Sequence, residues 1–291
     1  MQVGVALPTM AAGFTRSAML EWCQAVDAGP FSSISTGERV SFFNPELITT
    51  TAMAAALTSR VRIVTNVVVA PLHAPAMLAQ QLSTIDVMAQ GRLDVGLGVG
   101  GRPHDYQATG KAWTQRHEIV EQVARELKRL WSGEPAFEGS DPVGPAPYRT
   151  GGPAILAGAM GPKALARAAR YADGVTGFSI TGDESDIRAT NDLARAAWAD
   201  AGRDEPRLIS GSFFVGGIPG ARVELERFAQ TYLSFLGPEL AATLAHQVRA
   251  DHVGELRRIL DGAREAGCEE FIVVPGTWDL RCLEAIATAA S

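Results

Sequence analysis

The chain has 291 residues, of which 46% are hydrophobic and 20% charged, so length and composition allow either one large barrel or two ordinary domains. The formal net charge of −6 disfavours nucleic acid and anionic membranes as partners, because an acidic surface repels phosphate groups. The first residues, Met1 to Pro8, lack the basic start and long apolar run of a secretory signal, which predicts a cytoplasmic protein.

Two further features of the composition need an interpretation. The segment Ile63–Ile85 carries no charge and has the length of a membrane span, but Pro71 and Pro75 interrupt it, so we expect a strand, a loop and a helix there. The three cysteines, Cys23, Cys268 and Cys282, follow no metal-ligand spacing. We expect them to be buried thiols, and we expect no metal site.

Short apolar runs alternate with longer segments of helical periodicity along the whole chain, which is typical of parallel βα units. Eight strands are predicted, over Val3–Leu7, Phe31–Thr36, Val61–Val69, Leu93–Val99, Ala154–Ala157, Gly174–Phe178, Leu208–Val215 and Phe271–Val274. The helices predicted between and after them cover Ser17–Asp27, Pro45–Thr58, Pro75–Met88, a long amphipathic helix with Trp113, Val120, Val123, Leu127 and Leu130 on one face, Pro162–Tyr171, Glu184–Ala201, segments across Ala221–Ala266, and Thr277–Ala290.

Eight strands, each followed by helix, predict an α/β fold with a single (β/α)8 TIM barrel over residues 1–291. The Pro- and Gly-rich stretch Gly133–Pro153 is interpreted as a loop insertion on the surface, because no second core begins after it. A doubly wound sheet is disfavoured, since Pro8-Thr9-Met10 follows the first strand where a dinucleotide fold would carry its glycine fingerprint. In a barrel the active site lies where the strands end and the βα loops begin.

The predicted strand ends are rich in glycine and small apolar residues and poor in catalytic groups. They contain no Ser-His-Asp order, no nucleophile elbow and no HExxH spacing. Such a rim suits a large planar cofactor that brings its own reactivity.

One stretch makes the chain similar to a known family. Residues 59–101, running from Arg62-Ile63-Val64-Thr65 to Gly91-Arg92-Leu93 and Gly96-Leu97-Gly98-Val99-Gly100, resemble the bacterial luciferase-like family of flavin- and deazaflavin-dependent oxidoreductases. Supporting matches are Gly37-Glu38-Arg39, Trp131-Ser132-Gly133-Glu134-Pro135 and the segment from Gly161-Pro162-Lys163 to Asp173-Gly174. Together they cover most of residues 3 to 180, and the final third is generic.

The resemblance implies where a cofactor would bind. In similar enzymes a bulge with a non-proline cis peptide supports the ring from behind, and the matching bond here is Asn66–Val67. The loop Gly158-Ala159-Met160-Gly161 opens a helix and could hold a phosphate on free N–H groups. The remaining cofactor contacts that we expect are Thr9, Gly98 and Gly100. Each of these residues also has a structural interpretation, as a strand end, a helix start or a tight turn.

Several relatives carry a histidine after the acidic residue that follows strand two, where this chain has Arg39. Arginine cannot act as a general base near neutral pH, so Arg39 is expected to bind an anionic substrate or a cofactor oxygen. Proton transfer then falls to Glu38 or His104, the only histidine on a predicted strand-end loop.

The sequence therefore predicts an oxidoreductase that uses deazaflavin coenzyme F(420), or alternatively FMN, for hydride transfer or monooxygenation of a small organic substrate. The family resemblance further implies a homodimer and a separate reductase that supplies the reduced cofactor. Two alternatives stay open. One is a barrel lyase or isomerase acting on a phosphorylated metabolite, which needs a lysine or an acid–base pair at strand ends. The other is a non-catalytic flavin-binding relative.

Overall fold

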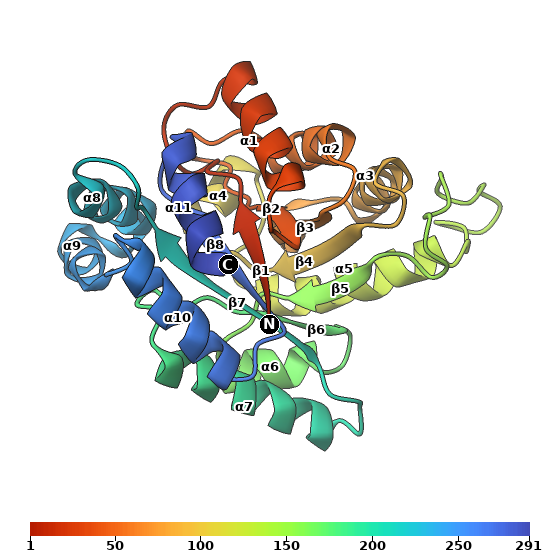
Figure 1. The fold of residues 1–291 in the computed structure, drawn as a ribbon. Helices are drawn as coiled ribbons and strands as arrows, with labels where there is room; N and C mark the ends of the chain where they lie inside the picture. Colours follow the sequence, from red (N-terminus) through yellow and green to blue (C-terminus); the bar gives the residue numbers. More distant parts are fainter.

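The computed structural model describes residues 1–291, in which eight parallel strands close into a barrel in chain order (Figure 1). The strands are β1 Gln2–Ala6, β2 Ser33–Thr36, β3 Arg62–Val69, β4 Leu93–Gly98, β5 Ala154–Ala157, β6 Gly174–Thr176, β7 Arg207–Phe214 and β8 Glu270–Pro275. The barrel closes where Val3 of β1 pairs with Phe271 of β8. The (β/α)8 TIM barrel predicted from the alternation of elements is confirmed.

Helices surround the barrel and connect successive strands. They are α1 Arg16–Ala28, α2 Leu47–Leu57, η1 Ala70–Leu72, α3 Pro75–Met88, α4 Pro103–Ala108, α5 Arg116–Trp131, α6 Pro162–Ala168, α7 Glu184–Asp200, α8 Ala221–Leu233, η2 Ser234–Leu236, α9 Pro238–Gln247, α10 Val253–Glu265 and α11 Leu280–Ala290. Three α-helices and the short η2 follow β7, and the pair α8 and α9 lies together at one edge of the molecule (Figure 1).

Local sequence explains where several helices begin. Thr15 precedes α1 and accepts a hydrogen bond from the Ala18 N–H at 3.2 Å, and Asp279 does the same for Arg281 at the start of α11. Prolines open α3, α4 and α6, where the missing N–H would have no partner within the helix.

Several predicted elements differ from the observed ones, among them the last helix, which is predicted from Thr277 and begins at Leu280. Trp113 does not belong to the long amphipathic helix, because α4 ends before Gly110, which has a φ of +67°, and α5 begins only at Arg116. Trp113 packs instead edge-on against Tyr106 of α4, with 5.0 Å between the ring centroids. The helix predicted to reach Tyr171 ends at Ala168, and the strand predicted to reach Phe178 ends at Thr176.

The loop insertion, the uncharged segment and the cysteines have the structures that the sequence predicts. Gly133–Pro153 contains no helix or regular strand and projects from the side of the barrel near α5 (Figure 1). Residues 63–85 divide among β3, η1 and α3, and none of the helices combines the length and apolarity needed to cross a bilayer. All three cysteines are buried and unpaired, and burial raises the pKa of Cys23 and of Cys282 to about 12.

Side chains fill the barrel in layers, as in other TIM barrels. The middle layer is apolar and consists of Ala6, Val64, Leu156, Ile209 and Ile272, with Val274 packed against it. Glycines at positions 4, 96 and 211 leave no space for a Cβ, which would meet a neighbouring strand within 2.5 Å. The middle layer therefore separates the two ends of the barrel.

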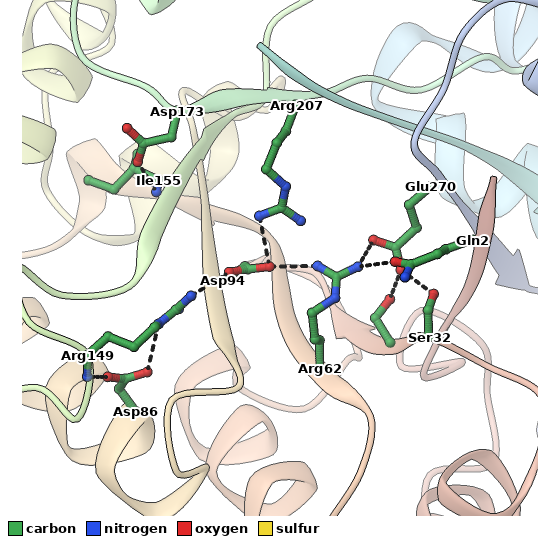
Figure 2. Close-up of polar contacts among 11 residues, drawn as sticks. Gln2, Ser32, Arg62, Asp86, Asp94, Arg149, Ile155, Asp173, Arg207 and Glu270 are labelled. Atoms are coloured by element: carbon green, nitrogen blue, oxygen red, sulfur yellow. Dashed lines mark hydrogen bonds and ion pairs between the residues drawn. The ribbon is translucent and has the colours of Figure 1, made fainter. Parts of the chain in front are cut away.

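The end of the barrel where the strands begin is closed by a network of ion pairs (Figure 2). Asp94 is 2% exposed and accepts from Arg62 at 2.7 Å and from Arg149 and Arg207 at 3.2 Å each. Glu270 pairs with Arg62 as well and accepts from the hydroxyls of Ser32 and Ser33. The loop insertion Gly133–Pro153 contributes Arg149 to these ion pairs, and the Arg149 backbone N–H also donates to Asp86. We call this set the base network.

Candidate active site

A cavity of about 390 Å³ opens at the other end of the barrel, where the strands end. Its volume falls in the range of small-molecule sites. Every strand or the loop after it contributes to the lining, which consists of Ala6, Leu7, Thr9, Met10, Ser35, Gly37, Asn66, Val67, Gly98, Val99, Gly100, Gly101, Gly158, Met160, Thr176, Gly177, Phe178, Phe213, Tyr232 and Val274. The cavity thus lies where the barrel rule placed the active site.

The side of the cavity formed by β3 contains a bulge. The pairing of β3 with β4 shifts register between Thr65 and Val68, and the peptide bond Asn66–Val67 inside the bulge is cis, as predicted. The Asn66 side chain is held in place, because its Oδ1 accepts a hydrogen bond from the Thr176 hydroxyl at 3.0 Å. Asn66 and Val67 therefore both face the cavity from a fixed position.

Two glycines make room for Val67. A Cβ on Gly98 would lie 2.7 Å from Val67 Cγ2, and a Cβ on Gly158 would lie 3.0 Å from Val67 Cγ1. Contacts this close exclude an alanine at position 98 unless Val67 moves. These two positions are glycine because the Val67 side chain occupies the space that their own side chains would need.

Polar groups in the lining are few and neutral. Ser35, at the end of β2, is 1% exposed and its hydroxyl has no hydrogen-bond partner, although buried hydroxyls normally have one. Thr9 and Thr176 add two further hydroxyls. No lysine, arginine, histidine, cysteine or carboxylate lines the cavity, and Tyr232 carries its one ionisable side chain.

Aromatic side chains form the wall next to β7. Phe213 packs edge-on against Phe178, Phe228 and Tyr232, with ring centroids 4.7 to 5.3 Å apart. Three of these rings belong to the lining, while Phe228 lies behind them on α8. The wall suits a mostly apolar molecule, and a cavity without acids or bases must receive its reactivity from a bound reagent.

Comparison with known proteins agrees with this geometry. The family model described as luciferase-like monooxygenase matches residues 1–291. The chain belongs to the luciferase-like monooxygenase family.

Individual members of the luciferase-like family are more distant. The oxygenase component of the flavin-dependent trigonelline monooxygenase from Acinetobacter baylyi is 32% identical over 122 residues, which are 40% of this chain and 34% of that protein. A phthiodiolone/phenolphthiodiolone dimycocerosates ketoreductase from Mycobacterium tuberculosis is 31% identical over 177 residues, 58% of this chain and 46% of that protein. The chain spans about half the length of the curated relatives it matches.

Among solved structures, the monooxygenase RslO1 from Streptomyces bottropensis superposes with a TM-score of 0.81 at 22% identity, covering 99% of this chain and 98% of that one. At this identity the likeness shows the luciferase-like fold alone.

The structure brings most of the predicted cofactor contacts of this luciferase-like chain to one place. Thr9, Asn66, Val67, Gly98, Gly100, Gly158 and Met160 all line the cavity. Ala159 and Gly161 do not, although they belong to the same loop, and the space next to Gly161 is open. Their role as cofactor contacts stays a prediction.

The three predicted catalytic residues lie outside the lining. Both carboxylate oxygens of Glu38 are engaged, one by the backbone N–H of Val69 at 2.5 Å and the other by His73 Nε2 at 2.8 Å. This places Glu38 behind the end of β3, where it supports the bulge. His104 is exposed on α4 and does not face the cavity. A role for either in proton transfer stays a prediction.

Arg39 is buried beside the cavity rather than in it. Its Nη2 donates to the carbonyl oxygen of Tyr232 at 2.7 Å, and its guanidinium carbon lies 3.7 Å from the centroid of the Tyr232 ring. Sequence reasoning missed Tyr232 and Phe213, and it did not single out Ser35 or Thr176. Phe213 ends a predicted strand and could have been identified by position, but Tyr232 reaches the cavity from α8, which no local signal indicates.

Proposed function

We propose that the chain is an oxidoreductase that holds the ring of a flavin-type cofactor, deazaflavin coenzyme F(420) or FMN, against the Asn66–Val67 bulge. The single observation that supports this most is the lining, which offers an aromatic wall and the Asn66–Val67 bulge but no acid or base. A reduced ring of this type supplies a hydride or, for FMN, reacts with oxygen. The protein then has to bind the cofactor, orient the substrate against it and exclude water.

Named residues fit these tasks. Val67, locked between Gly98 and Gly158, gives the ring a firm surface, and Thr176 keeps Asn66 in position. The buried and unpartnered hydroxyl of Ser35 is available to donate to a ring or substrate oxygen. The backbone N–H groups near Met160, just before α6, suit the phosphate group that both cofactors carry.

The names of similar proteins support both cofactors without choosing between them. The trigonelline monooxygenase component is flavin-dependent by name, and an F(420)-dependent secondary alcohol dehydrogenase superposes with a TM-score of 0.77 at 17% identity. A lyase or isomerase is disfavoured because no lysine and no acid–base pair lines the cavity. The homodimer and the separate reductase stay predictions.

The test is titration of the purified protein with FMN and with F(420), followed by the fluorescence of the cofactor. We expect one of them to bind with a Kd on the order of micromolar, at least about 10-fold more tightly than the other. Reduced cofactor should then be oxidised when a substrate is added, whereas a non-catalytic binding protein would leave its spectrum unchanged. The absence of binding for both cofactors would refute the proposal.

A pair of variants locates the binding site. Thr176→Val is nearly isosteric and removes the hydroxyl that donates to Asn66, so cofactor affinity should fall about 5-fold, the equivalent of one hydrogen bond. Thr190→Val removes a hydroxyl that bonds only the Asp186 carbonyl within α7, and affinity should stay unchanged. Equal behaviour of the two variants would place the cofactor elsewhere.

A further inference from the structure

Two arginines share one set of aromatic rings beside the cavity. The guanidinium carbon of Arg39 lies 4.6 Å from the ring centroid of Phe42 and 5.6 Å from that of Phe235, in addition to its contact with Tyr232. The guanidinium carbon of Arg102 lies 5.3 Å from Phe42 and 5.6 Å from Phe235. We call these five residues the arginine–aromatic box.

The box contains guanidinium N–H donors that have no hydrogen-bond acceptor. Arg39 is 7% exposed, and its Nη1 is buried without a hydrogen-bond partner. Arg102 donates from Nη2 to the Ser41 carbonyl oxygen at 3.1 Å. Its Nε lies 3.6 Å from Asp105 Oδ2, beyond hydrogen-bond distance, and its Nη1 is buried without a hydrogen-bond partner. Arginine donors left without a partner in a protein interior are costly, so these donors are available to a ligand that carries acceptor oxygens.

The charge of the box is also unbalanced. Its nearby carboxylate is Asp105, whose Oδ2 lies 3.6 Å from Arg102 Nε. The other oxygen of Asp105 already accepts from the Val40 N–H, the Ser41 N–H and the Ser41 hydroxyl. Burial and the charge of Arg102 lower the pKa of Arg39, against the opposing effects of Tyr232 and Asp105. An arginine nevertheless remains charged at neutral pH, so two cations face one carboxylate.

The box adjoins the cavity at two points. Tyr232 belongs both to the box and to the cavity lining. Gly101 lines the cavity as well, and a Cβ at that position would lie 3.3 Å from the ring of Phe235. A molecule that lies against Tyr232 and Gly101 in the cavity therefore lies next to the box, although neither guanidinium group itself lines the cavity.

From this arrangement we infer that the arginine–aromatic box recognises the carboxylate of a planar aromatic substrate. The guanidinium fork matches a carboxylate in geometry, and the surrounding rings match an aromatic body. The inference rests on the proposed function, because the substrate has to lie next to the cofactor ring. It adds a substrate class, aromatic carboxylates, and assigns Arg39 and Arg102 to substrate binding.

The experiment compares 2-naphthoate with its neutral analogue 2-naphthamide. Both probes are titrated by calorimetry into protein loaded with the cofactor that it binds, at neutral pH. We expect naphthoate to bind at least about 10-fold more tightly, because the neutral amide leaves the second cation unbalanced. Arg102→Gln should remove most of this preference, and Arg39→Gln should do the same. Arg281→Gln, which removes a surface arginine paired with Asp279, should keep it.

The outcomes separate this inference from the proposed function. Equal affinity for the two probes, or a preference that Arg102→Gln leaves intact, would overturn the inference while cofactor binding stands. Failure to bind either cofactor would overturn the proposed function. Since Arg39 also donates to the Tyr232 carbonyl oxygen, its glutamine variant destabilises α8 as well. Arg102→Lys, which retains the charge but not the fork, provides the second measurement and should keep only part of the preference.

Discussion

Gly98→Ala offers the sharpest test of how the cavity is built. The added methyl group would lie 2.7 Å from Val67 Cγ2, about 1 Å inside ordinary carbon–carbon contact. Valine is stiff about χ1, so it cannot turn aside freely, and overpacking of this kind costs about 1–3 kcal/mol. If the cofactor ring rests on Val67, a displacement of this side chain should reduce cofactor affinity by about 5- to 150-fold.

The assay measures two quantities for each variant, cofactor affinity by fluorescence titration and the free energy of unfolding by urea denaturation. Gly177→Ala is the matched control, because it also lines the cavity but its Cβ would meet Ile209 O and Thr190 Cγ2 at an ordinary 3.7 Å. The double variant Gly98→Ala/Val67→Ala removes the clash and should recover most of the stability. Wild-type affinity and stability in Gly98→Ala, or no recovery in the double variant, would show that Val67 is not the platform.

Three further predictions concern stability, each measured by urea denaturation. Asp94→Asn should lower the free energy of unfolding by about 1.5–3 kcal/mol, because the buried Asp94 loses the charge that three half-buried arginines share. Asp261→Asn at an exposed ion pair should cost less than about 1 kcal/mol, and equal losses would contradict the role of the network. Asp27 has its pKa lowered to about 2 by hydrogen bonds from Ser59, Val61 and Arg60, which outweigh its burial, so its contribution to stability is present above about pH 4 and is lost as the pH falls towards 2. Asp27→Asn should flatten the pH dependence in that window, and an unchanged slope would refute the assignment. Glu38→Ala leaves the Val69 N–H without its partner and should cost about 1–3 kcal/mol, whereas no loss would deny Glu38 a supporting role.

The fold could be predicted from the sequence because its signal is local and repeated. Runs such as Val61–Val69 are apolar on both faces, and helical spacing follows each run, so the order of elements already determines a barrel. The residues at which elements begin and end are harder to predict than the order of the elements. Trp113 continues the apolar spacing of α5, but Gly110 in a left-handed conformation ends the preceding helix and the chain turns before Arg116.

The site was predictable only where it depends on the strands. The end of β3 and the glycines after β4 and β5 are strand-end positions, and they meet at the cavity because all parallel strands end on the same side. The arginine–aromatic box depends on a contact between residues 39 and 232, which are 193 positions apart, and no local pattern indicates such a pair. His104 shows the opposite error. The sequence places it on a loop at a strand end, but in the structure it is an exposed residue of α4.

The base network has a consequence for access to the proposed site. Ion pairs and a buried apolar layer close one end of the barrel, so a cofactor and a substrate would both enter and leave the cavity at the other end. Val67 lies within β3, whereas Arg102 lies four residues beyond the end of β4, so a substrate held at Arg102 would lie nearer the opening than a cofactor seated against Val67. The cofactor would then bind first and the substrate would cover it. We therefore expect a compulsory order, in which the product leaves before the cofactor.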